Sequence, residues 1–289
     1  MRRIALFVAL AAASVTGMAV AQENGEWKTS ARTGLALSQS SLSDNWSGSE
    51  TGSVAWTWTF LGEAEKQLSR TALWSNTLNT AFGQTHQYDR EVERWEKPIK
   101  STDKIRFDSV MRFTLGGLVD PYVGGYFKSQ FYGEMEGQDA RILNPALISE
   151  SAGIAKALLE GEGKNLVTRV GVAFRQNRNV FAAGENWTND GGLEWVTDAK
   201  LASEEEKTIY LSKLTVFKAI VFSESDALEG TPMEDYWKSP DIDWENTFST
   251  RLAEWLSFDF YFQLVYDKQQ SKKGQYRQNM GVGLVYRFL

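Results

Sequence analysis

The last two segments of the chain alternate between apolar and polar side chains. Within residues 255–267 the intervening positions are mostly polar, and every second position is apolar: Leu256, Phe258, Phe260, Phe262, Leu264 and Tyr266. Residues 275–288 repeat the pattern with Tyr276, Met280, Val282, Leu284, Tyr286 and Phe288. A period of two is that of a β-strand with two unlike faces. The sequence therefore predicts strands with one wholly apolar face.

The length of these segments indicates where that face lies. Strands of soluble sandwiches usually have about five or six residues, whereas a tilted strand needs about 9–11 residues to cross the hydrocarbon layer. Both segments exceed ten residues and carry aromatic side chains near their ends, as in the interfacial girdles of membrane barrels. We therefore predict a transmembrane β-barrel. A soluble periplasmic or secreted β-protein is the alternative, because its strands alternate too.

Twelve segments of the chain are candidate strands: 27–38, 52–61, 70–84, 103–115, 121–133, 145–158, 165–176, 191–201, 207–221, 242–252, 255–267 and 275–288. The expected fold is all-β, an antiparallel up-and-down transmembrane β-barrel of about 12 strands. Segment 145–158 alternates weakly. Segment 207–221 leaves either Lys213 or Lys218 on the lipid side, which requires a bulge or a lysine that extends to the interface. Ten or fourteen strands therefore stay open as alternatives.

The connections between these segments alternate in length. Short connections at 62–69, 116–120, 159–164, 202–206 and 253–254 follow long ones at 39–51, 85–102, 134–144, 177–190 and 222–241, and 268–274 is intermediate. Outer-membrane barrels have short periplasmic turns and longer external loops. This alternation places both termini on the periplasmic side.

The N-terminus has the pattern of an export signal. Arg2 and Arg3 precede an apolar run, and Ala19-Val20-Ala21 is a small-residue cleavage site. We expect residues 1–21 to be a secretory signal peptide and residues 22–289 to form the barrel. The expected location is the outer membrane of a Gram-negative bacterium.

Composition and charge narrow the partners. The chain has 31 basic and 37 acidic residues and no cysteine. Without Arg2 and Arg3 the balance is 29 against 37, a net charge of −8, so no general attraction to nucleic acid is expected. The absence of cysteine excludes disulfides and thiolate metal sites. No phosphate-binding loop, dinucleotide fingerprint or zinc spacing is present, so we expect no cofactor and no metal.

The acidic segment 222–241 leaves one alternative open for a metal. It contains Glu224, Asp226, Glu229, Glu234 and Asp235. Such oxygen ligands suit Ca²⁺, but the glycine-bearing spacing of a helix-loop-helix calcium site is absent. The favoured interpretation is a solvated acidic surface.

The final strand resembles the recognition signal of outer-membrane barrels, which ends in phenylalanine. Tyr286 and Phe288 keep the alternation, but Leu289 follows them. The resemblance implies the barrel-assembly machinery as a partner, besides outer-membrane lipid. We expect the barrel to be a monomer.

Residues 37–48, Leu-Ser-Gln-Ser-Ser-Leu-Ser-Asp-Asn-Trp-Ser-Gly, resemble the opening motif of a family of Gram-negative outer-membrane β-barrel proteins, domain of unknown function 3078. Residues 241–245, Asp-Ile-Asp-Trp-Glu, resemble its C-terminal part. A more distant resemblance is to salt-stress-induced outer-membrane barrels. Neither family implies an established activity or a catalytic residue for this chain.

Charges of both signs fall on the polar faces of the predicted strands. The candidates to line the lumen are Arg106, Asp108, Arg112, Arg169, Arg175, Asp198, Arg251, Asp259, Arg277 and Arg287. Such walls are typical of a narrow water-filled pore for small polar solutes. At about twelve strands, opposed charges would alternatively pair and plug the bore, which is the favoured interpretation. Tyr122, Tyr126 and Tyr132 share one polar face and would narrow it further.

The predicted external loops contain four tryptophans: Trp46, Trp95, Trp187 and Trp237. Exposed rings near amide side chains suit a sugar- or peptide-binding surface, although the rings can equally hold long loops over the barrel mouth. The single histidine, His86, falls in the predicted loop 85–102 that also contains Trp95, and no serine lies in a recognisable nucleophile context. We therefore expect a non-enzymatic barrel, a narrow or plugged channel, with surface binding as the alternative.

Overall fold

Twelve antiparallel strands close into one ring. The computed structural model describes residues 25–41, 51–89, 92–182 and 186–288. In ring order the barrel strands are β1 (Lys28–Ser40), β2 (Ser53–Ser69), β3 (Ala72–Asp89), β5 (Ile99–Phe113), β6 (Asp120–Ser129), β9 (Ala146–Gly161), β10 (Lys164–Arg178), β11 (Trp187–Ala202), β12 (Thr208–Phe222), β13 (Asp241–Ala253), β14 (Leu256–Tyr266) and β15 (Gln275–Arg287). Pairing of β15 with β1 closes the ring. The predicted all-β barrel of about 12 strands is confirmed, and the proposed signal peptide lies outside the described residues.

The long connections carry small elements of their own. β4 (Arg94–Trp95) extends the sheet beside β3, and β7 (Tyr132–Gly133) pairs with β8 (Arg141–Ile142). A single helical turn, α2 (Ser225–Leu228), lies between β12 and β13, and a 3₁₀ turn spans Glu204–Glu206. In the described part of the chain, no helix combines the length and apolar character needed to cross a bilayer.

The strands β2 and β3 are longer than the sequence pattern predicted. They meet at Arg70 and Thr71, so the expected turn at 62–69 is wrong. Its acidic residues gave it the composition of a turn, but they point into the barrel: Glu63 accepts a hydrogen bond from Lys200 and Glu65 accepts one from Ser75. The weak segment 145–158 is a full strand, β9, which pairs with β6 and β10.

The structure resolves the direction of the two lysines on β12. Lys213 points inward, where its ammonium lies 2.8 Å from Asp108 and 2.9 Å from Asp198. Lys218 is exposed on the outer face. Of the two predicted solutions, the lysine on the lipid side is therefore the one observed, because the register shift between β11 and β12 lies beyond Lys218, between Gly191 and Gly192, and does not turn this side chain inward.

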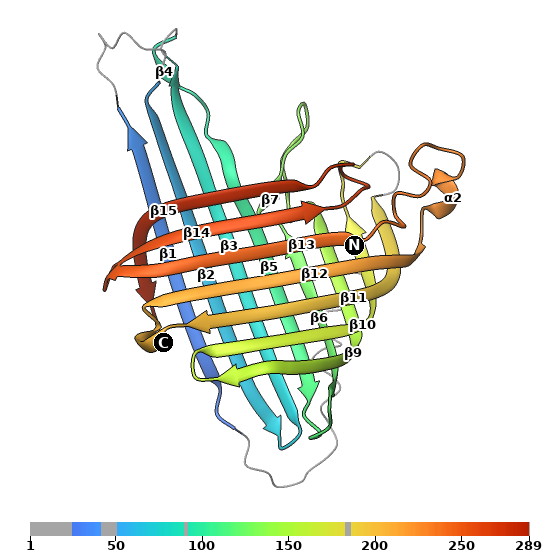
Figure 1. The fold of residues 1–289 in the computed structure, drawn as a ribbon. Coiled ribbons are helices and arrows are strands. Elements are labelled where there is room, and N and C mark those ends of the chain that lie inside the picture. The colour runs from blue at the N-terminus through green and yellow to red at the C-terminus, as the bar shows by residue number, and fades with distance from the viewer. Residues whose placement is uncertain (1–24, 42–50, 90–91, 183–185, 289) are drawn as a thin grey trace.

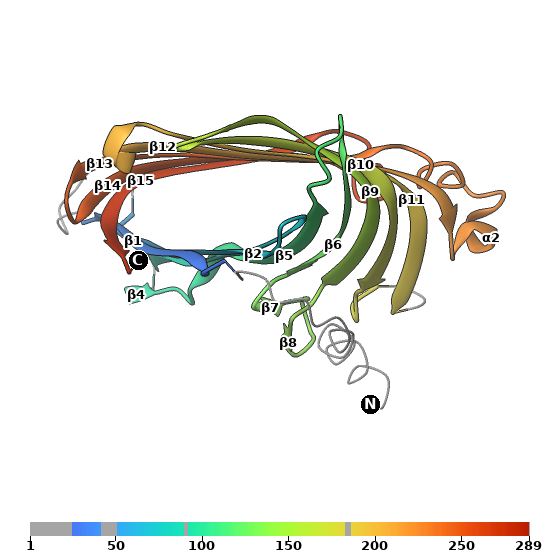
Figure 2. The same cartoon turned by 90° about the horizontal axis from the view of Figure 1, so that it is seen from below.

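The barrel is flattened. Figure 1 shows β12–β15 crossing β1, β2 and β3 at a steep angle, and Figure 2 shows these two groups as facing walls with β9, β10 and β11 bending sharply between them. The described short turns join strands at one end of the barrel and the long connections at the other, hereafter the short-turn end and the long-loop end. Flattening brings opposite strands within reach of each other's side chains.

Glycines concentrate at the bends. The strands of one corner contain Gly124, Gly125, Gly153, Gly171, Gly191 and Gly192, and those of the other contain Gly34, Gly281 and Gly283. Gly153 and Gly171 face each other in register. A Cβ at Gly171 would lie 2.3 Å from the carbonyl oxygen of Ala152 and 2.8 Å from the Tyr122 hydroxyl. The sharp bend therefore depends on the missing side chains.

Gly171→Ala is expected to lower the free energy of unfolding by about 1–3 kcal/mol, the usual cost of overpacking, because the methyl group collides with backbone. Gly161→Ala is the matched control, since nothing lies within 4 Å of the position that its methyl group would take. It should change stability by less than about 0.5 kcal/mol. Denaturant titration of the refolded protein compares the two, and equal effects would contradict the tight corner.

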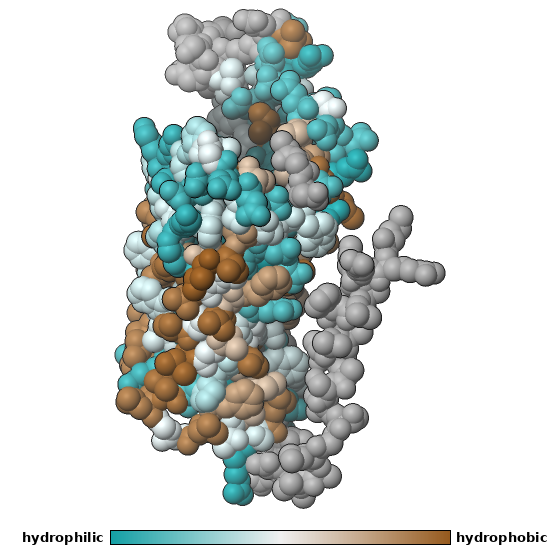
Figure 3. Space-filling view, turned by 90° about the vertical axis from the view of Figure 1, so that its right-hand side faces the viewer, coloured by the Kyte–Doolittle hydropathy of each residue, from teal (hydrophilic) through white to brown (hydrophobic). Residues whose placement is uncertain are grey.

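The outer face of the barrel is apolar and exposed. Val172 is 62% exposed, Leu193 51% and Val282 47%. Figure 3 shows apolar side chains gathered over the wall, with hydrophilic side chains above them. The buried residues are largely polar by contrast, and include Arg106, Asp190, Glu194 and Glu245. The chain is thus inverted relative to a water-soluble β-protein.

Candidate functional site

The inward faces of the strands carry the charges. β5 places Lys104, Arg106, Asp108 and Arg112 on one face, because alternate residues of a strand share a direction. β13, which faces β5 across the barrel, contributes Asp243 and Glu245 in the same way. The site is therefore the barrel interior itself.

A chain of ion pairs crosses the middle of the interior. Arg106 donates two hydrogen bonds to Asp108, from Nε at 2.8 Å and from Nη2 at 3.0 Å. Lys213 joins Asp108 to Asp198. Arg169 then donates from Nη2 to Asp198 at 3.1 Å. Side chains from β5, β12, β11 and β10 thus form one network of alternating charge.

Lysines connect opposite walls. Lys104 on β5 donates to Glu245 on β13, and these strands are six positions apart around the ring of twelve. Lys200 on β11 donates to Glu63 on β2 at 2.8 Å, which is also a separation of six strands. Lys128 on β6 bonds Asp243 on β13 at 2.5 Å. Lys213 on β12 and Asp108 on β5 are likewise five positions apart, so four lysine–carboxylate pairs of the described residues span the short axis of the barrel.

Tyrosine rings lie against several of the cations in the interior. The Arg106 guanidinium lies 4.9 Å from the Tyr126 ring centroid, and the Lys128 ammonium lies 5.3 Å from the same ring. Arg169 lies 5.7 Å from the ring of Tyr122. Both tyrosines are buried, as the predicted narrowing of the bore requires. Cation–π contact adds attraction that strengthens away from water.

A second charged layer lies toward the long-loop end. Arg175 donates two hydrogen bonds to Asp190, at 2.7 and 2.6 Å, and one to Asp241 at 2.8 Å. Its guanidinium carbon lies 3.5 Å from the centroid of Phe217, which is 1% exposed. Trp237 packs against the cluster of Phe217, Ala173 and Ala219. The loop that carries Trp237 is thereby fastened over this corner of the mouth.

Below the central network the interior opens into a cavity of about 470 Å³, hereafter the short-turn cavity. Arg106, Asp108 and Lys213 line it on the side of the network, and Glu65 and Arg112 line it elsewhere. Arg112 donates from Nη2 to Glu160 at 2.7 Å. The wall of the cavity therefore carries both positive and negative side chains.

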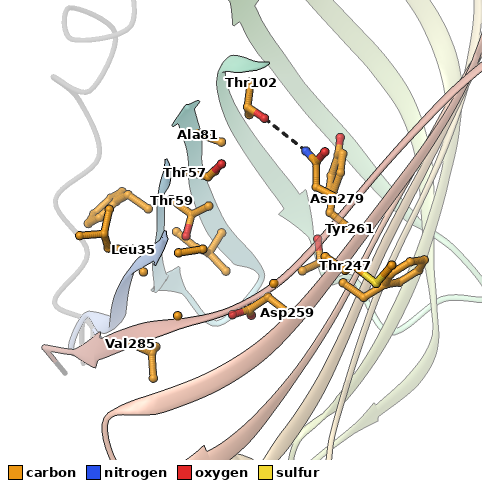
Figure 4. A pocket seen from close by; sticks show the side chains of 18 of the residues that line it. Leu35, Thr57, Thr59, Ala81, Thr102, Thr247, Asp259, Tyr261, Asn279 and Val285 are labelled. Carbon is orange, nitrogen blue, oxygen red and sulfur yellow. Dashed lines mark hydrogen bonds between the residues drawn. The ribbon is translucent and has the colours of Figure 1, made fainter. Parts of the chain in front are cut away.

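A smaller cavity of about 190 Å³, hereafter the seam cavity, lies beside the strands β1 and β15. Figure 4 shows Thr57, Thr59 and Thr102 facing Tyr261 and Asn279 across it. Asn279 donates to the Thr102 hydroxyl at 3.2 Å. Leu61, Asn79, Leu211 and Thr247 line both cavities and so separate them.

The other predicted lumen residues have neighbouring partners. Asp259 accepts hydrogen bonds from Ser249 and Ser257 on the adjacent strand and its own. Arg277 donates from Nε to Gln263 at 2.8 Å and lies 5.4 Å from the Tyr261 ring. Arg251 donates to the carbonyl oxygen of Glu205, so it holds a turn at the short-turn end rather than crossing the interior. The side chain of Arg287 lies outside the described residues.

The predicted loop tryptophans occupy different settings. Trp237 stacks on Phe222 at 6.0 Å between centroids, and Trp95 meets Tyr88 edge-on at 5.6 Å. Trp187 is the first residue of β11, so it belongs to a strand end rather than to the loop before it. Trp95 is 50% exposed and Trp187 40%. Trp46 lies outside the described residues.

Two other expectations change in the structure. His86 lies in β3, paired with Val54, not in a loop. Tyr132 belongs to β7 and its ring lies 5.8 Å from Phe82 and 4.7 Å from the Lys100 ammonium, so it is not stacked in the bore with Tyr126. The reason is that the segment 121–133 is not one strand: β6 ends at Ser129, and the chain then folds back against the outer aromatic residues Phe82 and Trp58.

The acidic segment before β13 is partly neutralised. Lys238 donates to Asp235 at 2.6 Å, and this hydrogen bond lowers the pKa of the Asp235 carboxyl and raises the pKa of the Lys238 amine. Glu234 accepts a hydrogen bond from the backbone of Gly230. Within the described residues, no three acidic or histidine side chains converge as a metal site would require.

The sequence pattern places Lys104 and Lys200 on polar strand faces, but it did not predict that they connect opposite walls. Most arginines pair within a strand or with nearby strands, as Arg106 does with Asp108, although Arg106 also lies 3.8 Å from Glu245 on the opposite wall. Lys104 and Lys200 alternate with the other inward residues, but their partners Glu245 and Glu63 are 141 and 137 residues away. The alternation along each strand indicates that these side chains point inward. It does not indicate which carboxylate each one meets.

Comparison with known proteins gives a family match over part of the chain and two distant structural likenesses. Residues 37–133 match the family described as protein of unknown function (DUF3078), which includes the serine-rich motif but not residues 241–245. The translocator domain of the autotransporter NalP from Neisseria meningitidis is 11% identical, covering 98% of this chain and 94% of that one, with a TM-score of 0.34. The COG4313 outer membrane channel from Pseudomonas putida F1 is also 11% identical, covering 93% and 96%, with a TM-score of 0.40. Among curated proteins no sequence matches significantly.

A double-mutant cycle on Lys104→Met and Glu245→Met should give a coupling of about 1–3 kcal/mol in the free energy of unfolding, because each single change leaves a charge without its partner in the interior. The solvent-exposed pair Lys238 and Asp235 is the control and should give a smaller coupling. Equal coupling in the two cycles would show that the wall-to-wall pair contributes no more than a surface contact.

Proposed function

We propose that the chain is an integral outer-membrane β-barrel. The carrying observation is the exposed apolar outer face combined with a charged interior. A soluble protein rarely exposes a contiguous apolar surface of this extent, whereas a membrane barrel requires one. In this orientation the long-loop end faces the exterior and the short-turn end faces the periplasm.

We further propose that the barrel is a narrow channel that its own ion pairs hold closed. Four lysine–carboxylate pairs of the described residues join strands five or six positions apart, and one of them, Lys213 with Asp108, belongs to the network from Arg106 to Arg169. Eight-stranded barrels are filled by side chains, and sixteen-stranded porins are open. At twelve strands, whether the bore is open or closed depends on how far the barrel is flattened. The wall-to-wall pairs are the observation that supports closure.

The lining favours small polar solutes. The short-turn cavity offers lysine and arginine as well as aspartate and glutamate, and about 470 Å³ holds a molecule of modest size. A solute with both signs of charge can replace the partners that it displaces, whereas a strongly charged one leaves like charges unpaired. The role proposed is passage, not catalysis.

Surface binding is the second candidate, because Trp95 and Trp187 remain exposed near the long-loop end. Such rings can stack on a ligand. Titration of a sugar or peptide panel against the Trp95→Ala and Trp187→Ala variants distinguishes this role from passage.

The substitution Val172→Arg tests membrane insertion. Val172 lies within β10 on the outer face, and arginine in the bilayer costs about 2–4 kcal/mol of folding free energy at the midplane. Val172→Leu is the control and should have little effect. The measurement is denaturant titration of the protein folded into vesicles. A cost for arginine below about 0.5 kcal/mol, as at a solvated surface, would contradict insertion.

The substitution Lys213→Met tests closure. Removal of this ammonium leaves Asp108 and Asp198 with one partner fewer, so water and cations should enter. In planar bilayers the unmodified protein should show little steady conductance, and the variant should conduct several-fold more with a preference for cations.

Lys218→Met provides the matched control, since the same change occurs on the same strand but on the outer face. It should leave the conductance unchanged. Large steady currents from the unmodified protein would overturn closure and favour an open porin.

A further inference from the structure

The join between the first and last strands is the weakest part of the ring. β1 and β15 share five residue pairs, from Arg32 with Arg287 to Ala36 with Gly283, whereas every other neighbouring pair of barrel strands shares at least eight within the described residues. Beyond Ala36 the strand β1 continues along β2 without β15, and the residues of β15 before Gly283 pair only with β14. The two edges therefore separate toward the long-loop end.

The seam cavity occupies this separation. Its lining includes lumen-facing Thr57, Ala81 and Asn279. The same cavity is lined by Leu35, Met280 and Leu284, which belong to the exposed apolar face. Residues from both faces of the sheet therefore border one cavity, at the place where β1 and β15 separate. Figure 4 shows Leu35 and Val285 beside the junction, with Ala81 and Thr102 deeper inside.

We propose that this gap is a lateral site that takes the end of an acyl chain from a neighbouring membrane lipid. The proposal rests on the proposed membrane location. The outer mouth is continuous with the apolar face, so hydrocarbon chains are the molecules that meet it. About 190 Å³ is close to the size of a dry cavity of about 150 Å³ that accepts one benzene ring, so a few methylene groups fit and a head group does not.

Small side chains keep the gap open. Gly281 lies on β15 within the cavity lining, and a Cβ built there would be 3.6 Å from the nearest atom, the Cβ of Ala36. That is ordinary van der Waals distance, so a larger side chain can be accommodated and would extend into the gap. Gly281→Leu should therefore fill the site from within without breaking the barrel.

The absence of cysteine allows single-site labelling of the full chain. Three variants, each carrying one fluorophore, are compared: Ala81→Cys in the seam cavity, Ser75→Cys on the same strand in the short-turn cavity, and Leu193→Cys on the outer face. Each is folded into phosphatidylcholine vesicles whose acyl chains carry a nitroxide quencher. Heat-modifiable gel mobility verifies folding of every variant.

The label at residue 81 should be quenched several-fold more strongly than the label at residue 75, and Gly281→Leu should remove that excess. The label at residue 193 should be quenched in both backgrounds. Equal quenching at residues 81 and 75, or quenching at 81 that survives Gly281→Leu, would overturn the lateral site while leaving the membrane location intact. Absence of quenching at residue 193 would overturn both.

Discussion

Ion pairs that cross the short axis of the barrel are the interaction on which the interior depends. Lysine suits this position because its long, flexible side chain reaches the opposite wall and presents a single charged group. Lys104, Lys128 and Lys200 each meet a carboxylate on a strand five or six positions around the ring. Twelve strands could enclose a bore, but these contacts draw the walls together.

The flattened section and the ion pairs require each other. A round ring would hold Glu245 away from Lys104, and an unpaired charge in a poorly hydrated interior is costly. The glycines at the bends, such as the facing pair Gly153 and Gly171, permit the curvature that brings the walls close. The glycines at the bends and the ion pairs of the interior thus favour the same flattened cross-section. At the other corner β1 and β15 diverge, and the seam cavity lies between them.

The alternation of side chains was sufficient to predict the strands and the direction of most residues, because the two faces of each strand meet opposite environments. The alternation gave wrong predictions where the difference between the two faces was small. Glu63 and Glu65 made a strand resemble a turn, and Tyr132 continued an alternation that the chain ends at Ser129. The pairing of Lys104 with Glu245 was beyond sequence reasoning, since periodicity gives the direction of a side chain and not its distance from another wall. The two cavities follow from the flattened section and were not predictable either.

The central claim, that charge pairs hold the walls together, is tested most directly by the distance between β5 and β13. Spin labels on the outward positions Phe107 and Phe248 report that distance by double electron–electron resonance in vesicles, because these strands face each other across the ring. In the otherwise unmodified protein the distribution should be narrow. With Lys104→Met and Lys213→Met together it should broaden and move to longer distance as the barrel becomes rounder. An unchanged distribution would show that the backbone fixes the flattened shape alone, and would contradict the account.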